Sequence, residues 1–392
     1  MKKFPSIIQI NEKLLESAKK EKFSGHDPFD FLNSSFFNSL PIKNIGLIRL
    51  AWLQLGKRSP INLRKLVGVP KMRNPKGVAL YILGMLEDYS RTGDVSLLDG
   101  ARDLGDWLIK NKSNQDEWDF PCWGYHFDWQ ARAFFVPAGK PNMITTYYVS
   151  RALYNLGKTL KNDRFINESF NSAKFVSKYL FTKENKKEFY AYIPGESALV
   201  HNASLWGASW CGFVGKKIGD DKLINQSLNV ARNSVDDQNL DGSWVYGSRH
   251  HHNFIDGFHT GYNLEALKLI SDDLEISDFD ESISRGYKYY LENLFDYDGN
   301  AKYYNNSVFP LDMHSFSQAI FTILKVGGKE EDVIFCKKVV EKAISMLYLN
   351  SKNRFAYQKN KFFQNNVNYS RWTQAWSYYS LAFFIKTIEA KD

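Results

Sequence analysis

Apolar residues recur at helical spacing along most of the chain, in two alternating kinds of segment. The first kind has apolar residues on one side and polar residues opposite, which is typical of helices that are covered on one face. The second kind carries small and aromatic residues all round, as in GASWCGFVG around Cys211, which indicates burial on both sides. We therefore expect outer and inner helices to alternate. The expected outer helices span residues 96–111, 167–181, 221–235, 281–295 and 331–349.

Six inner helices are expected, each after a polar, aromatic-rich stretch. Their starts are 68, 56, 58, 53 and 59 residues apart, which indicates a degenerate repeat of helical hairpins. The starts are Gly77, Thr145, His201, His259, Asp312 and Arg371.

Repeated antiparallel hairpins either stack into an open solenoid or close into a ring. A solenoid needs polar capping repeats, but the last inner helix, 372–386, is as apolar and aromatic as the others. We therefore predict an all-α fold, a single (α/α)6 toroid domain over residues 1–392, in which helices within 1–60 complete or flank the ring. Short aromatic and glycine-containing segments before the inner helices are expected to form small strands or turns at one mouth, where we place the functional site.

Composition and charge limit the kinds of ligand and cell compartment that we expect for this protein. The formal net charge of +8 is spread along the chain without a block of like charges, which favours an acidic small molecule or glycan over nucleic acid. The three cysteines lie far apart and indicate neither a disulfide framework nor a zinc ribbon. No apolar stretch is long enough for a membrane span or a signal-peptide core, so a cytoplasmic protein without a membrane span is expected. The sequence leaves the oligomeric state open.

Four of the junctions carry histidine or arginine at the start of an inner helix. Asp256 and His259 are three positions apart and form either an acid/base pair or a capping aspartate beside a histidine. The Gly77 junction lacks such residues and is expected to be mainly structural. The run His250 to His252 is not expected to bind metal, because adjacent loop residues point in different directions. The candidate catalytic residues are His259, Asp256, His314, Asp312, His201 and Tyr369.

Aromatic, amide and charged side chains beside these junctions suit a sugar or a carboxylate. Arg371 is able to clamp a carboxylate with two hydrogen bonds, and a structural salt bridge is the alternative. No glycine-rich phosphate loop and no metalloprotease or CxxC motif occurs, so neither a cofactor nor a metal is expected. The candidate substrate-binding residues are Asn202, Arg371, Trp372, Trp244, Tyr246, Tyr125, His126, Asp128, Trp129, Asp30 and Asn33.

Several motifs resemble a family encoded in bacterial capsule and exopolysaccharide gene clusters. They include HDPFDFLNS (26–34), IPGESALVHNASLWGA (193–208) and IDGFHTGYNLEAL (255–267), and the resemblance spans roughly residues 24 to 385. Members are labelled polysaccharide biosynthesis proteins and often, misleadingly, delta-aminolevulinic acid dehydratase. The family is similar to six-hairpin toroids, which include glycoside hydrolases, uronate lyases and the helical domain of glucuronyl epimerases. The resemblance thus implies work on a polysaccharide without fixing the reaction.

Two kinds of chemistry fit these residues. Hydrolysis needs two carboxylates, which Asp128, Asp256 and Asp312 are placed to supply from neighbouring hairpins. Lyase or C5-epimerase chemistry needs a base and a cation or amide near the substrate carboxylate, as the histidine and arginine junctions provide. We favour an enzyme that cleaves an acidic glycan as a glycoside hydrolase or uronate lyase. The alternatives are a uronate C5-epimerase, a non-catalytic glycan-binding or assembly scaffold, and an isoprenoid cyclase with an apolar cavity and an aspartate cluster.

Overall fold

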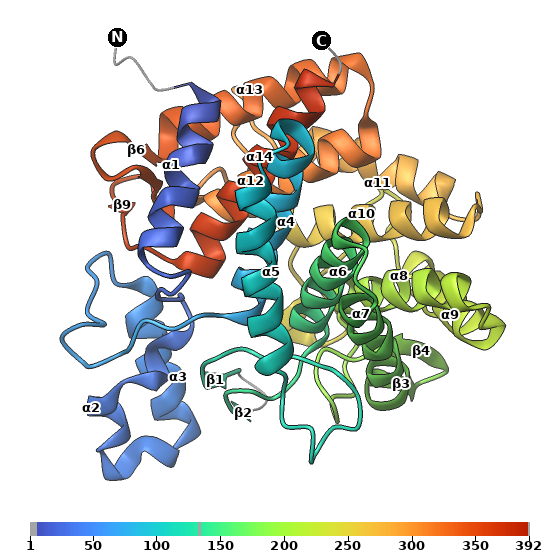
Figure 1. The fold of residues 1–392 in the computed structure, drawn as a ribbon, viewed down its shortest axis with the longest axis horizontal. Coiled ribbons are helices and arrows are strands. Elements are labelled where there is room, and N and C mark those ends of the chain that lie inside the picture. Colours follow the sequence, from blue (N-terminus) through green and yellow to red (C-terminus); the bar gives the residue numbers. More distant parts are fainter. Residues whose placement is uncertain (1–5, 132–134, 391–392) are drawn as a thin grey trace.

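Six inner helices form a closed ring in the computed structural model, which describes residues 6–131 and 135–390. Each inner helix contacts the next one along the chain, and the last contacts the first (Figure 1). The predicted six-hairpin ring is therefore confirmed. The inner helices are α4 (Pro75–Thr92), α6 (Met143–Leu160), α8 (His201–Ile218), α10 (Gly257–Leu274), α12 (Met313–Thr322) and α14 (Trp376–Glu389).

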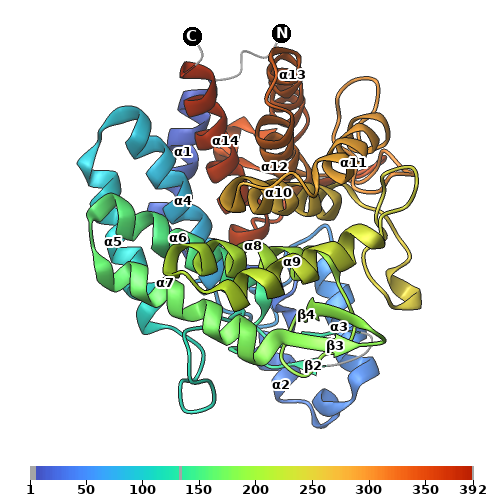
Figure 2. The ribbon, with the colours of Figure 1, turned by 90° about the vertical axis from the view of Figure 1, so that its right-hand side faces the viewer.

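Outer helices cover the ring, one for each inner helix. Figure 2 shows α7 and α9 lying outside α6 and α8. Five outer helices follow their inner partners along the chain, whereas α1 comes from the N-terminal part and packs against α14. The outer helices are α1 (Ile7–Lys20), α5 (Val95–Lys110), α7 (Asp163–Phe175), α9 (Asp221–Asp236), α11 (Asp280–Asn293) and α13 (Glu330–Leu347).

The remaining N-terminal helices lie outside the ring. α2 (Ser35–Asn38) and α3 (Gly46–Arg58) form a small projection beside β1, at the lower left of Figure 1. Short 3-10 segments occur at η1 (Asp30–Asn33), η2 (Pro41–Asn44), η4 (His250–His252) and η6 (Asn350–Lys352), and π-helical segments at η3 (Val176–Leu180), η5 (Ile323–Gly327) and η7 (Ser370–Ala375). Within the described residues, no helix is both long and apolar enough to cross a membrane.

Side-chain caps fix where the inner helices begin. The Asn74 side chain accepts hydrogen bonds from the first-turn N–H groups of α4, and Pro75 occupies the first helical position, where it costs no hydrogen bond. Asn142, Asp256 and Asp312 cap α6, α10 and α12 in the same way. The last inner helix differs from expectation, because Arg371 lies in the π-helical η7 that leads into α14.

Short antiparallel strands join the hairpins. One sheet has the order β5 (Leu311–Asp312), β8 (Gln358–Lys359), β9 (Gln364–Asn365), with Leu311 opposite Lys359. The other pairs have two strands each. They are β1 (Trp129–Gln130) with β2 (Phe135–Val136), β3 (Phe181–Glu184) with β4 (Lys187–Tyr190), and β6 (Tyr348–Leu349) with β7 (Arg354–Phe355).

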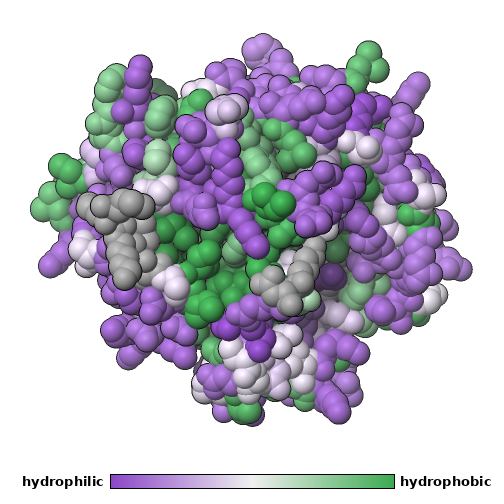
Figure 3. Space-filling view, turned by 90° about the horizontal axis from the view of Figure 1, so that it is seen from above, coloured by the Kyte–Doolittle hydropathy of each residue, from purple (hydrophilic) through white to green (hydrophobic). Residues whose placement is uncertain are grey.

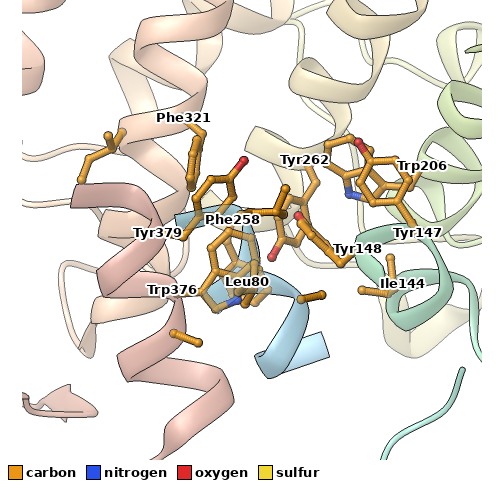
Figure 4. Packing of buried hydrophobic residues seen from close by; sticks show 14 of the residues in the cluster. Leu80, Ile144, Tyr147, Tyr148, Trp206, Phe258, Tyr262, Phe321, Trp376 and Tyr379 are labelled. Atoms are coloured by element: carbon orange, nitrogen blue, oxygen red, sulfur yellow. The ribbon is translucent and has the colours of Figure 1, made fainter. Parts of the chain in front are cut away.

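An aromatic layer fills the middle of the ring. Tyr147 stacks on Trp206 with ring centres 4.2 Å apart, and the Tyr148 ring lies 5.4 Å from Trp376 in an edge-to-face arrangement. Tyr262 joins the same layer 6.0 Å from Trp376. Figure 4 shows these side chains meeting from different inner helices. The layer closes the centre of the ring and leaves a cavity at the end where the inner helices begin.

Candidate active site

A cavity of about 250 Å³ lies at this mouth of the ring. Each of the six inner-helix junctions contributes to its wall, and the other lining residues of the described chain are all aromatic. The junction residues are Lys76, Ile144, Asn202, Phe258, His259, Tyr262, His314, Arg371 and Trp372. The other lining residues are Phe29, Tyr125, Phe127, Trp129, Tyr192, Tyr246, Phe254 and Tyr303.

His259 is held in one orientation by Asp256. Asp256 caps α10, and its Oδ1 accepts the His259 backbone N–H at 2.8 Å. Its Oδ2 lies 2.6 Å from His259 Nδ1. The Asp256 side chain is 1% exposed and that of His259 is 21% exposed, so the carboxylate stands behind the ring and the ring reaches the cavity. A proton on Nδ1 completes this bond and leaves Nε2 as a proton acceptor, which is the arrangement of a general base.

A second pair, Tyr262 and His314, lies on the same wall. The Tyr262 hydroxyl is 2.5 Å from His314 Nε2. Burial, and then the nearby charges of Lys76 and Arg371, hold the pKa of His314 well below its usual range, while burial raises the pKa of Tyr262. Both side chains are therefore neutral, and a single hydrogen bond joins them. The Phe258 ring contacts His314 at 4.8 Å and His259 at 4.2 Å between ring centres, so the two pairs are neighbours.

Lys76 and Arg371 both reach the cavity, and among the described residues only Arg371 has a counter-ion. Arg371 makes a bidentate ion pair with Asp27, at 2.6 and 2.8 Å. Lys76 is 3% exposed, and its ammonium lies 4.5 Å from the centre of the Tyr148 ring. No carboxylate among the described residues lies within ion-pair distance of Lys76. Burial, and then the charge of Arg371, lower its pKa well below the usual value. An anionic ligand would supply the missing counter-charge.

The amide of Asn202 is also unsatisfied. Asn202 is 3% exposed and lines the cavity, and its Oδ1 has no hydrogen-bond partner among the described residues. A buried polar atom without a partner costs free energy unless a ligand or water satisfies it. Asn202 therefore adds a polar contact for a bound molecule.

About half of the residues predicted for the site line the cavity. They combine the acid/base, cationic and aromatic groups that the sequence analysis assigned to the helix junctions. They are His259, His314, Asn202, Arg371, Trp372, Tyr246, Tyr125 and Trp129, with Asp256 directly behind His259.

Asp312 does not line the cavity. It caps α12 by accepting the His314 backbone N–H at 2.8 Å, and it accepts further hydrogen bonds from Gln358 at 2.7 Å and from the Trp372 indole at 3.2 Å. Burial raises the pKa of Asp312 to about 6. It therefore positions Trp372 and has no direct access to a substrate.

His201 and Trp244 lie away from the cavity because they face the outer helix α9. His201 Nδ1 is 3.3 Å from the Ser234 hydroxyl, and Nε2 is 4.0 Å from Asp237. Burial lowers the pKa of His201 to about 4. The Trp244 indole donates to the Ser234 carbonyl at 2.8 Å. Both side chains join α8 and the loop after α9 to that outer helix.

Tyr369 and Asp30 belong to a buried cluster around Arg64. The Arg64 guanidinium donates to Asp30 at 2.6 Å and to the Tyr369 hydroxyl at 3.1 Å. All three side chains are buried, and none lines the cavity. The cluster attaches the N-terminal projection to the ring.

The loop before α6 uses the other predicted residues for its own structure. Asn33 donates to the His126 carbonyl at 3.0 Å and accepts from the Asp128 N–H at 3.2 Å. The Asp128 carboxylate accepts the Ala138 N–H at 2.8 Å, and the His126 ring lies 3.0 Å from the Asn74 amide. These three side chains therefore shape the wall without lining it.

Four polar lining residues were not predicted from the sequence: Lys76, Tyr192, Tyr262 and Tyr303. The Asn74-Pro75 cap starts α4 before Gly77, which brings Lys76 into the first turn, so this junction is not merely structural. Tyr262 lies one turn after Phe258 on α10. Among the described residues, no group of three histidine, cysteine or acidic side chains is placed to hold a metal ion.

The closed ring of six helical hairpins defines an (α/α)6 toroid. No protein-family model and no curated protein matches the chain. Solved structures with the same fold include an unsaturated glucuronyl hydrolase specific for heparin, with a TM-score of 0.65 and 12% identity over 98% of this chain and 96% of that one.

Two further similar structures are epimerases. Cellobiose 2-epimerase from Bacillus thermoamylovorans has a TM-score of 0.62 and 10% identity over 96% of this chain and 99% of that chain. A sugar epimerase from a ruminal bacterium has a TM-score of 0.63 and 12% identity over 82% and 90%. At such low sequence identity, structural similarity shows the fold alone. That fold is the predicted (α/α)6 toroid.

Proposed function

We propose that this chain is an enzyme that acts on an acidic sugar of a bacterial surface polysaccharide and removes the proton from the carbon next to the sugar carboxylate. The observation that carries the proposal is the His259–Asp256 pair, which faces a cavity whose cations are Lys76 and Arg371. Cations beside the substrate carboxylate stabilise the negative charge that develops when the neighbouring carbon loses its proton. The substrate is a glycan intermediate in the cytoplasm, before export, as the resemblance to capsule and exopolysaccharide proteins implies.

Each polar group has a role in this reaction. Lys76 and Arg371 bind the carboxylate, the free Oδ1 of Asn202 accepts a hydrogen bond from a sugar hydroxyl, and His259 Nε2 takes the proton from C5. In a lyase the C5–H electrons then form a double bond to C4, the C4–O bond breaks, and Tyr262 gives its proton to the leaving oxygen. In a C5-epimerase C5 instead takes a proton from water on the opposite face, and His259 releases the first proton to solvent. Both outcomes begin with the same step.

Hydrolysis has less support. It needs two carboxylates on either side of the glycosidic bond, and no aspartate or glutamate occurs among the lining residues within the described chain. Asp256 is engaged by His259, and Asp312 lies behind Trp372. The same lack of carboxylates speaks against an isoprenoid cyclase. The two neighbouring acid/base pairs, His259–Asp256 and Tyr262–His314, favour an enzyme over a binding scaffold.

The test is incubation with a panel of uronate-containing oligosaccharides in deuterated water. A lyase gives the ultraviolet absorbance of an unsaturated uronate, and an epimerase gives deuterium at C5 without cleavage. We expect His259→Ala to lower either rate by about 10²- to 10⁴-fold. His251→Ala, an exposed histidine outside the cavity, is the matched control and keeps full activity. New reducing ends without unsaturation, or full activity of His259→Ala, would refute the proposal.

A further inference from the structure

The N-terminal projection carries an unusual surface. From Phe31 to Leu86 the chain contains no aspartate or glutamate. Exposed basic residues in this stretch include Lys43, Arg58 and Lys65. Large apolar side chains are exposed between the same residues, and we call this set the N-terminal apolar surface. It consists of Phe36, Ile42, Ile45, Leu47, Leu55, Ile61 and Leu66.

Helix α3 contributes Leu47 and Leu55 to this surface and buries few of its own residues. Only Leu53 and Gly56 of its residues are buried, whereas Leu47 is 77% exposed and Leu55 is 50% exposed. The outer helices of the ring, by contrast, bury one apolar face each. Large apolar side chains exposed together on one projection are typical of an interaction site.

The projection that carries this surface borders the mouth of the cavity. α3 packs against β1, which contains the cavity residue Trp129. The ammonium of Lys57, near the end of α3, lies 4.4 Å from the ring centre of Phe29, another cavity residue. In Figure 1 the projection lies at the bottom of the view, far from α13 at the top. The face seen from above is largely hydrophilic, with a central apolar strip (Figure 3).

We propose that the N-terminal apolar surface docks on an anionic lipid bilayer. Exposed aliphatic side chains enter the boundary between headgroups and acyl chains, and nearby lysine and arginine residues attract anionic headgroups. The lack of acidic residues removes the repulsion that such a membrane would otherwise exert. A second copy of the chain is a poorer occupant, because two such surfaces would bring like charges together without acidic partners.

Docking in this way holds the mouth of the cavity next to the bilayer. The sugars of a lipid-linked glycan also lie next to the bilayer surface, at the height of the cavity mouth. The inference rests on the projection alone and does not depend on which reaction the cavity performs.

Vesicle co-sedimentation of the full chain tests the docking. We expect the protein to sediment with phosphatidylcholine vesicles that contain phosphatidylglycerol and to stay in the supernatant with phosphatidylcholine alone. Binding weakens as salt is added, because salt screens the headgroup charge. Failure to sediment with either vesicle, or equal sedimentation with both, would overturn the proposal.

Two sets of variants separate the charged and apolar contributions. Lys43→Glu with Arg58→Glu and Lys65→Glu is expected to lower vesicle affinity by more than about tenfold, because each basic residue contributes about fivefold. Ile45→Ser with Leu47→Ser is expected to lower it by about fivefold or more.

The matched control places the same kinds of change on α13. Ile334→Ser with Lys337→Glu alters an exposed apolar and an exposed basic residue there and leaves binding unchanged. Unchanged thermal midpoints show that all variants are folded. Equal losses in the control, or a wild-type dimer in light scattering that Ile45→Ser with Leu47→Ser dissociates, would contradict membrane docking.

Discussion

Lys76 occupies an environment that its own charge disfavours. It is buried among Tyr148, Tyr262 and Trp376, with ring centres 4.5 to 5.7 Å from the ammonium. Aromatic faces attract a cation, but they compensate for only part of the lost hydration. The side chain therefore lowers the stability of the empty protein and raises its affinity for an anion.

Replacing Lys76 separates these two effects. We expect Lys76→Met to raise the free energy of unfolding by about 1–2 kcal/mol, because an unpaired buried amine is replaced by an apolar chain of similar length. The same change is expected to raise KM for an acidic substrate about 10- to 100-fold, since a charge-assisted contact is lost. Urea unfolding and steady-state kinetics measure the two quantities.

The control is Lys325, which is paired with Glu265 at 2.5 Å near the other end of the ring. Lys325→Met leaves the Glu265 carboxylate without its counter-ion and is expected to lower the free energy of unfolding by about 1–3 kcal/mol. A loss of stability in Lys76→Met as well would show that Lys76 is a structural residue.

Sequence predicts which junctions are polar more readily than which side chains reach the cavity. His201 and Asn202 are adjacent in the first turn of α8, yet only Asn202 lines the cavity. Successive residues of a helix point in directions about 100° apart, so the orientation depends on how α8 sits in the closed ring. That arrangement is set by contacts with other helices and is not visible in the local pattern.

Helix positions are the most predictable feature of this chain at the level of elements. The expected inner starts lie within two residues of the observed ones, apart from Arg371, because hydrophobic periodicity and caps are local signals. The strands are harder to predict. β5 pairs with β8, so that Asp312 lies opposite Gln358, and this pairing depends on the ring bringing distant segments together.

Glycines decide how closely the elements approach. On α4, a Cβ at Gly84 would lie 2.5 Å from the Tyr378 ring of α14. On α5, a Cβ at Gly100 would meet nothing closer than 3.8 Å. The first glycine is required by helix packing, whereas the second is not.

Matched alanine substitutions test this difference. We expect Gly84→Ala to lower the free energy of unfolding by about 1–3 kcal/mol, because it forces α4 and α14 apart. Gly100→Ala is expected to raise it by about 0.5–1 kcal/mol through better helix propensity. Both values come from urea unfolding. Equal effects of the two substitutions would mean that contact with α14 does not constrain α4.

The whole ring is closed by residues far apart in the sequence. Asp27 and Arg371 are 344 positions apart and form a buried bidentate ion pair. Deeper in the ring, Asp88 of α4 accepts hydrogen bonds from Asn11 of α1 at 3.0 Å and Tyr378 of α14 at 2.9 Å. Arg371 therefore both helps to close the ring and lines the cavity.

Breaking the Asp27–Arg371 pair tests that link. We expect Asp27→Asn to lower the free energy of unfolding by about 3–5 kcal/mol, because it leaves a buried guanidinium without its counter-ion, and to abolish most activity. Asp99→Asn, which breaks an exposed ion pair with Arg102, is the control and changes stability by less than about 1 kcal/mol. Activity that survives Asp27→Asn would separate closure from the site.

The Asp27–Arg371 pair also has a consequence for protein synthesis. Proteins are synthesised from the N-terminus, so Asp27 leaves the ribosome long before Arg371 is added to the chain. During that interval the cavity lacks a cation and part of its wall, although most hairpins are already translated. The mouth cavity is therefore complete only after the last hairpin has been made.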